Sequence, residues 1–373
     1  MPTHIQDLLA YQLAARHYPG AIVHVERAGK VLAHHVVGRT GPEDDAPELH
    51  DEAPFRIASL TKAVTSVAAL TLVQEGRLSL DAPITEYLPE MAELRTVSGA
   101  RPARVATVRD LLRHTSGFAY AGEIRESAAR ARATEAGLDT RVPNIDPQTF
   151  VAGLAGLPLP IEPGTRFRYG PSTDVAGVII ERIAGVPLAE IVRTRIFAPL
   201  GMTQTGFEVE PARQPLLTAP YPEDAAWHAI GPRLGIRTPG RPWMDSGGGG
   251  LVSTITDYAR FARMIADGGV ANGERILGPE LFAEMARDQL PEGLDGPTGF
   301  TGPGFGFGLA LAVRLDWGAA AMPCKPGELT WSGVTGTALF AHPGERWFAL
   351  AFSCNTTSRM MARMELRRAL ARS

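Results

Sequence analysis

The feature that most constrains the fold is the placement of strand-like segments at both ends of the chain, with mainly helical segments between them. Residues 21–27 and 30–38 are rich in strand-forming residues and are joined by a two-residue turn, which predicts a hairpin. The same strand character returns in residues 305–315, 335–343 and 346–355. We therefore expect one antiparallel sheet that is built from both ends of the chain and interrupted by a helical insertion.

Apolar residues at helical spacing predict the remaining elements. Helices are expected at residues 5–17, 59–76, 108–117, 123–137, 147–155, 173–184, 188–197, 255–267, 279–289 and 358–371. Stretches rich in Pro and Gly at 207–250 and 291–305 separate some of them, and loops of this length are more often functional rims than linkers. We predict an α/β domain from residues 1–60 and 300–373 and a mainly helical domain from residues 61–299.

The composition limits the possible partners. With 373 residues, 45% apolar and 21% charged, the chain is typical of a soluble globular protein, and no apolar run approaches the roughly 20 residues of a membrane span. The net charge is -3 and no cluster of basic residues is present, so we expect no nucleic-acid partner and no membrane partner. The N-terminal segment lacks the pattern of a secretory signal, which favours a cytoplasmic location unless a leader has been removed.

The cysteines and lysines are both few. Cys324 and Cys354 do not make a disulfide framework or a Cys/His cluster, so we expect free thiols and no metal site. Only three of the 37 basic residues are lysines, at positions 30, 62 and 325. A lysine that persists in such a background is a candidate for proton transfer near neutral pH, which arginine cannot perform.

Ser59 and Lys62 form an S-x-x-K step at the start of a predicted helix. A spacing of three residues places the hydroxyl and the amine on one helical face, where they can meet. The N-terminal end of the helix favours negative charge at the serine and lowers the proton affinity of the amine. This pattern indicates a nucleophile beside its own base.

Two further segments are candidates for the same site. Tyr169 ends an extended segment just before a helix, where its phenol can face a pocket and relay a proton; packing at a domain edge is the alternative. In residues 331–343, small residues lead into a strand, as a backbone that approaches a ligand requires; a β-bulge at a sheet edge is the alternative.

Over nearly its whole length the sequence resembles the serine hydrolases of the penicillin-binding-protein and class C β-lactamase type, and within them the family VIII carboxylesterases. The resemblance implies a β-lactamase-like α/β (α+β) fold, with an antiparallel sheet flanked by helices and a mainly helical domain. The segments that carry it are FRIASLTK around Ser59, LLRHTSGF at 111–118, EPGTRFRY before Tyr169, PLGMTQT at 199–205, GGGGLVSTITDYARFARMI at 247–265 and FGFGLAL at 305–311.

The resemblance assigns roles to individual residues. Ser59 becomes the acylated nucleophile and Lys62 its base. Tyr169 assists the proton transfer, and the backbone N–H groups of Ser59 and Val334 form the oxyanion hole. No metal or organic cofactor is implied. If Lys62 is the base, its pKa must fall by roughly two units or more from about 10.4, and Lys62→Arg must cost about three orders of magnitude in turnover.

Two departures from the family pattern point to the substrate. The second motif, usually Y-x-N, here has Pro171 in place of asparagine, while Asp174 fits the form common in the esterases. The third motif, usually K-T-G or H-x-G, falls on Trp331, Ser332 and Gly333, so the cation that binds a substrate carboxylate is missing. With Asp174 these three are the candidate substrate-binding residues, although Trp331 can instead pack under the following strand.

We therefore predict an enzyme that hydrolyses a small, uncharged carboxylic ester through an acyl-serine intermediate. A β-lactamase or D,D-peptidase with an amide substrate, an acyltransferase with the same catalytic residues, and an inactive binding module are the alternatives. The sequence does not give the oligomeric state.

Other conspicuous residues are better explained by structure than by catalysis. His114 and Ser116 lie in a predicted turn, and no G-x-S-x-G elbow is present. His34 and His35 are adjacent on a strand and point to opposite faces, so they cannot chelate one ion. Asp245 precedes a glycine run at 247–250, but no lysine follows it as a phosphate-binding loop requires.

Overall fold

A computed structural model describes residues 2–120, 124, 127–136, 138, 145–230 and 243–372. Parts of the helix expected at 123–137 and of the Pro- and Gly-rich stretch at 207–250 lie outside these residues.

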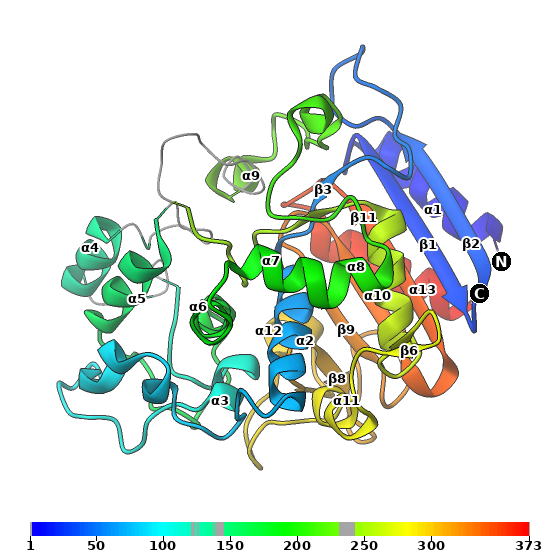
Figure 1. Cartoon of the computed structure of the whole chain (residues 1–373). Helices are drawn as coiled ribbons and strands as arrows, with labels where there is room; N and C mark the ends of the chain where they lie inside the picture. Colours follow the sequence, from blue (N-terminus) through cyan, green and yellow to red (C-terminus); the bar gives the residue numbers. More distant parts are fainter. Residues whose placement is uncertain are drawn as a thin grey trace.

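The largest element is an antiparallel sheet that takes strands from both ends of the chain, as predicted (Figure 1). Seven strands are found in it within the described residues, in the order β2-β1-β11-β10-β9-β8-β7. Their bounds are β1 Gly20–Arg27, β2 Lys30–Gly38, β7 Phe305–Phe307, β8 Ala312–Arg314, β9 Leu329–Ser332, β10 Ala338–His342 and β11 Trp347–Ser353. The first hairpin therefore pairs with the last strand, which brings the two ends of the chain together.

Helices cover both faces of this sheet. Helices α1 (Pro2–Ala14) and α13 (Arg359–Arg372) lie together on one face, close to the two chain ends (Figure 1). They bury Leu9 and Leu366 against Val23 and Phe340 of the sheet. Helix α10 (Ile255–Ala266) contacts β11, β10 and β1. Because successive side chains of a strand point to opposite faces, the covered strands are apolar on both sides.

The remaining helices come from the segments of the chain between β2 and β11. The α-helices are α2 Thr61–Gln74, α3 Val108–Leu112, α4 Ser127–Glu135, α5 Pro147–Ala155, α6 Ser172–Ala184, α7 Leu188–Val192, α8 Ala198–Leu200, α9 Ala225–Ile230, α11 Pro279–Ala286 and α12 Thr298–Thr301. Two short antiparallel pairings join β3 (Phe55–Arg56) to the distant β4 (Val252–Ser253) and β5 (Val270–Ala271) to the adjacent β6 (Glu274–Arg275). The division into two domains remains a prediction.

Helix α2 is the central helix of the core. Residues 61–72 are all buried, and the helix packs against α6. A helix that is buried on every side has no solvent-facing stripe, which explains its weak amphipathic pattern in the sequence. Its first turn is therefore held rigidly at the point where the S-x-x-K step lies.

The structure differs from the predicted elements at three places. The strand expected at 305–315 is a hairpin, β7 and β8, because the chain reverses at residues 308–311, where Ala310 has a φ of 138°. The helix expected at 108–117 ends at Leu112, and His114 has a left-handed φ of 59°. Strand β9 was not predicted, because it is only four residues long and was recognised solely as a motif.

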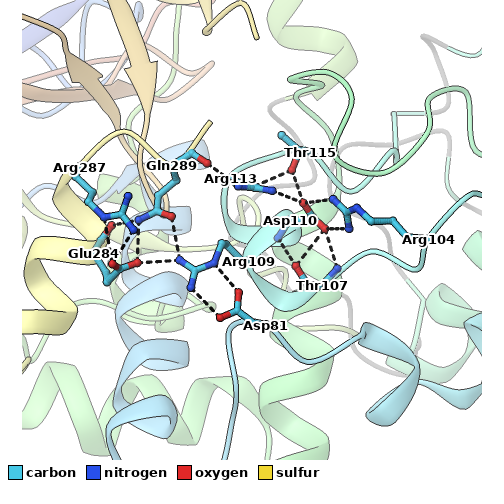
Figure 2. A network of polar contacts seen from close by, with 10 residues as sticks. All are labelled: Asp81, Arg104, Thr107, Arg109, Asp110, Arg113, Thr115, Glu284, Arg287 and Gln289. Carbon is cyan, nitrogen blue, oxygen red and sulfur yellow. Dashed lines mark hydrogen bonds and ion pairs between the residues drawn. The ribbon is translucent and has the colours of Figure 1, made fainter. Parts of the chain in front are cut away.

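A network of hydrogen bonds and ion pairs stabilises the turn that follows α3 (Figure 2). The buried carboxylate of Asp110 accepts hydrogen bonds from Arg104 (3.0 Å), Arg113 (2.8 Å) and the Thr115 hydroxyl (2.6 Å). It also completes a capping box with Thr107. Burial alone raises the pKa of Asp110, but these donors outweigh it and hold the pKa well below its usual range. The turn that carries His114 is thereby fixed beside the core.

Two further predictions concern the state of the cysteines and membrane-spanning helices. Cys324 and Cys354 are free thiols, as predicted. In the part of the chain that the structure describes, no helix combines the length and the apolar character needed to cross a bilayer.

Candidate active site

Ser59 lies at a sharp change of direction between β3 and α2. The 3-10 turn Ala58–Leu60 leads into the helix, and Ala58 has a left-handed φ of 45°, which is uncommon for a residue with a side chain. Within residues 53–72, all of which the structure describes, Ser59 alone is partly exposed. The local backbone therefore presents this one hydroxyl to solvent from an otherwise buried segment.

Lys62 lies one turn later, with no exposed surface. Its Nζ donates to Ser59 Oγ over 3.4 Å and to the carbonyl oxygen of Gly248 over 2.5 Å. The predicted contact between serine and lysine is present. The contact with Gly248 was not predicted, although the glycine run that contains it belongs to the segments that resemble the family.

Tyr169 completes the group from the segment before α6. Its ring centroid lies 4.7 Å from Lys62 Nζ, and its side chain is 7% exposed. The indole Nε1 of Trp331 donates to its phenol oxygen over 3.2 Å. Lys62 from α2 and Trp331 from β9 thus both contact Tyr169.

Aromatic rings enclose this phenol. The ring centroids of His114, Phe300, Trp331 and Tyr120 lie 4.7, 5.0, 5.2 and 6.2 Å from that of Tyr169. Trp331 is 2% exposed, so it packs in this cluster, and its indole N–H bonds a candidate catalytic group; a contact with substrate stays a prediction. Phe300 is 37% exposed and stands at the edge of the cluster; its position after a Pro- and Gly-rich stretch gave no signal in the sequence.

The pKa of Lys62 differs from the expectation. Burial lowers the pKa of this amine, but the coulombic attraction of Tyr120 and Tyr169 in their ionised forms and of Asp174, together with a hydrogen bond with Tyr169, outweighs burial. The net effect raises the pKa of Lys62 above its ordinary value, where the sequence analysis expected it to be lowered. The surroundings of Lys62 therefore favour the charged form of its amine.

Asp174 contacts the protein and is only 2% exposed. Its Oδ1 accepts from the Ser246 hydroxyl over 2.5 Å and from the backbone N–H of Gly248 over 3.0 Å. Burial raises the pKa of Asp174 although the Lys62 ammonium lowers it. Asp174 thus contacts the loop that binds Lys62, and its role in substrate binding stays a prediction.

The third motif contributes its backbone to the site. Gly333 and Val334 lie at the turn between β9 and β10. The turn is fixed to the segment before Ser59, because Thr337 Oγ1 donates to the Ile57 carbonyl over 3.1 Å. A Cβ on Gly333 would come within 2.5 Å of that carbonyl oxygen, so only glycine permits the approach.

Ser332 points to the other face of the sheet. Its hydroxyl accepts from Arg363 of α13 over 3.2 Å, while its neighbour Trp331 faces Tyr169. The sequence analysis grouped Ser332 with the substrate-binding residues, but the alternation along β9 places the two side chains on opposite sides. The partner, Arg363, was not recognised in the sequence.

The residues that the sequence analysis set aside lie in structural positions. His114 is buried among aromatic rings; burial and the nearby Lys62 charge hold its pKa well below the usual range. Ser116 bonds Ser172 over 2.8 Å. His34 bonds Asp51 over 2.9 Å. Asp245 accepts from the backbone of α7 and from Trp243, away from Lys62.

Comparisons with known proteins identify the family of this site. A profile of the Beta-lactamase family matches residues 5–372. The chain belongs to the Beta-lactamase family. It is an enzyme, a serine hydrolase of the β-lactamase and penicillin-binding-protein type, as the resemblance in the sequence implied.

Individual members of the Beta-lactamase family match almost the full chain. Protein Rv1367c of Mycobacterium tuberculosis is 36% identical over 342 residues, which are 87% of this chain and 82% of that protein. Esterase EstB of Burkholderia gladioli is 34% identical over 352 residues, which are 88% of this chain and 84% of that protein. The solved structure of EstCE1, a hydrolase with promiscuous acyltransferase activity, superposes with a TM-score of 0.82 at 24% identity, covering 99% of this chain and 98% of its own.

Proposed function

We propose that the protein hydrolyses small, uncharged carboxylic esters, with Ser59 as the nucleophile. The contact of 3.4 Å between Ser59 Oγ and Lys62 Nζ, beside the phenol of Tyr169, is the observation that carries this proposal. It places a partly exposed hydroxyl against two groups that exchange protons, as nucleophilic catalysis requires. The likeness to Esterase EstB supports an ester as the substrate.

In this proposal Lys62 stays charged and Tyr169 accepts the proton, which is supported by the contacts of the Lys62 amine with Ser59 and with the Tyr169 ring and by the raised pKa of Lys62. The reactive form of the Lys62–Tyr169 pair has lost one proton, and the lysine keeps its charge. The phenolate oxygen of Tyr169 then accepts the Ser59 proton while Ser59 Oγ forms a bond to the ester carbonyl carbon. The Lys62 ammonium and the Trp331 indole N–H stabilise the phenolate. This refines the expectation that Lys62 itself is the base.

The second half of the reaction uses the same groups in reverse. The backbone N–H groups of Ser59 and Val334 stabilise the tetrahedral oxyanion. When that intermediate collapses, the ester C–O bond breaks and Tyr169 gives its proton to the departing alcohol. Water then attacks the acyl-serine, loses a proton to Tyr169, and releases the carboxylic acid and the free Ser59 hydroxyl.

The third motif supports an uncharged substrate. Trp331 occupies the position where the resemblance implies a cation, and its only polar atom is directed at Tyr169. The partly exposed ring of Phe300 stands beside Trp331, and the partly exposed ring of Tyr120 stands beside Tyr169. In this proposal the entrance to the site is aromatic and favours neutral acyl or alcohol groups over a carboxylate.

The test uses two substrates and one labelling probe with the wild-type protein and Ser59→Ala. We expect hydrolysis of p-nitrophenyl butyrate, little hydrolysis of the β-lactam nitrocefin, and labelling of Ser59 by a fluorophosphonate probe. Ser59→Ala should remain folded and lose both turnover and labelling. Full ester turnover in this variant would refute the assignment, and faster turnover of nitrocefin than of the ester would favour a β-lactamase. An absence of labelling would favour a binding module.

Acyl transfer to an alcohol is the second candidate, because the acyltransferase activity named for EstCE1 occurs on the same fold. The chemistry differs only in the acceptor that attacks the acyl-serine. Adding a primary alcohol to the ester assay and measuring the new ester by mass spectrometry separates the two functions. Product that partitions mainly to the new ester at low alcohol concentration would favour transfer.

A further inference from the structure

A small cavity of about 30 Å³ lies behind the third motif, lined by residues of the sheet and of the helices α1 and α13. Ser332, Gly333, Gly336 and Thr337 line it from the turn between β9 and β10, and Arg363 lines it from α13. The cavity is on the face of β9 that carries Ser332, opposite to the face where Trp331 meets Tyr169. It is therefore separate from the site described above.

Arg363 is a buried cation whose hydrogen bonds all go to neutral oxygens. It is 4% exposed. Its guanidinium donates to the Ser332 hydroxyl over 3.2 Å, the Thr330 hydroxyl over 2.8 Å and the carbonyl oxygen of Phe300 over 3.3 Å. Among the described residues, its Nε–H has no acceptor. A buried charge normally has a counter-charge, because desolvation costs several kcal/mol per ion.

The nearby carboxylates are engaged elsewhere. Glu328 forms a two-point ion pair with Arg367, with distances of 3.0 and 2.5 Å. Glu365 accepts from the amide of Gln12 over 2.6 Å. No aspartate or glutamate is found on the cavity wall within the described part of the chain, whereas a second arginine, Arg359, lies on it. The wall therefore has a net positive charge.

The charge on Arg363 is incompletely compensated. Burial lowers the pKa of its guanidinium to about 10, and the attraction of Glu328 offsets only part of this effect. A negative charge bound in the cavity would offset the desolvation cost of the buried Arg363 guanidinium, because opposite charges attract strongly in a medium of low dielectric constant.

We propose that this cavity binds a monovalent anion of the size of chloride, held by Arg363 and the hydroxyl of Ser332. The volume has room for only one or two particles of the size of water, so a monatomic halide fits, while phosphate or a dicarboxylate does not. The Ser332 hydroxyl accepts from Arg363 and keeps its own proton free to donate to the anion. The apolar walls, including Leu366 and Phe352, exclude a large hydrated ion.

Thermal melting tests this site without use of the enzymatic activity. Sodium chloride is titrated against sodium gluconate at constant ionic strength, so that general screening stays fixed. We expect a saturable rise of about 3 °C in the Tm of the wild-type protein, because an anion that binds only the folded state stabilises it. Arg363→Gln should lose the rise. Arg368→Gln is the matched control, since Arg368 lies on the same helix and is exposed.

A wild-type Tm that does not depend on chloride, or an equal rise in Arg363→Gln, would overturn the proposal. If Arg363→Gln does not fold, Ser332→Ala provides the test, because it removes one ligand and leaves the guanidinium in place. It should raise the half-saturating chloride concentration at least fivefold, and an unchanged value would contradict the site. Crystals grown in sodium bromide should show anomalous density beside Arg363, and a cavity without bromide would also refute it.

Discussion

The indole N–H of Trp331 donates to the phenol oxygen of Tyr169 over 3.2 Å, so the third motif contacts the second through one hydrogen bond. A neutral donor takes the position where the related serine hydrolases are expected to have a cation. It can stabilise a developing phenolate, but it does not offer an ion pair to a substrate carboxylate. This single contact links the proposed proton transfer to the proposed preference for uncharged esters.

Trp331→Phe tests this contact. The substitution keeps an aromatic ring in the cluster but removes the donor, and a hydrogen bond to a charged group contributes about 1.5–3 kcal/mol. We expect kcat for p-nitrophenyl butyrate to fall by about one to two orders of magnitude. Phe307→Leu is the control, because the ring centroid of Phe307 lies 5.2 Å from that of Trp331 and the ring forms no hydrogen bond with Tyr169. An equal loss of kcat in both variants would indicate that packing alone matters.

Trp331→Lys tests whether the Trp331 side chain lines the substrate site or only packs in the aromatic cluster. Because Trp331 is 2% exposed, a new ammonium group there must be desolvated, and we expect a large drop in Tm. A stable variant that turns over anionic esters better than the wild type would contradict this expectation and would show that the position is open to substrate.

Lys62→Arg and Lys62→Met together test the charge state of the lysine. If the raised pKa of Lys62 reflects an ammonium that stabilises Tyr169, a side chain that keeps the charge should retain part of the function. We expect Lys62→Met to lose about three orders of magnitude in kcat and Lys62→Arg to remain at least tenfold more active. Equal inactivity in two variants with near-native Tm would return the role of general base to Lys62.

Asp174→Asn tests the loop that holds Lys62. The carboxylate accepts from Ser246 and Gly248, and the Gly248 carbonyl binds the lysine, so the substitution should displace the amine. We expect a tenfold to hundredfold loss of kcat with little change in KM, because the contact orients a catalytic group and not the substrate. Asp245→Asn, on the segment that contains Ser246 and Gly248, should leave kcat unchanged. A rise in KM for Asp174→Asn alone would favour direct substrate contact.

The sequence predicted the parts of the site that depend on local spacing. Ser59 and Lys62 meet because a helix brings residues three apart together, and their contact requires no knowledge of the rest of the fold. The sheet was predicted from alternating patterns, and its two end segments pair as expected. In contrast, the four residues of β9 are too few for a periodic pattern.

The properties that the sequence did not predict arise from contacts between distant segments. The pKa of Lys62 depends on Tyr120, Tyr169 and Asp174, which approach it only in the folded chain. The direction of Ser332 depends on the register of β9, because a shift by one residue exchanges the two faces of a strand. Nothing in the sequence distinguishes Arg363 from the other arginines, because its burial beside the third motif depends on how helix α13 packs against the sheet.

The last prediction concerns the stability of the network around Asp110 (Figure 2). Because the folded-state pKa of Asp110 is lowered, its contribution to stability is complete above the unfolded-state pKa of about 3.9 and is lost as the pH falls toward the folded-state value. Asp110→Asn should therefore lower the free energy of unfolding by about 2–3 kcal/mol at pH 7, and the difference from the wild type should shrink below pH 4. Urea unfolding at several pH values measures this. Asp81→Asn removes an exposed partner of Arg109 in the same network and should change the free energy by less than about 1 kcal/mol. A difference for Asp110→Asn that stays constant down to pH 2 would show that the charge of the carboxylate does not stabilise the turn.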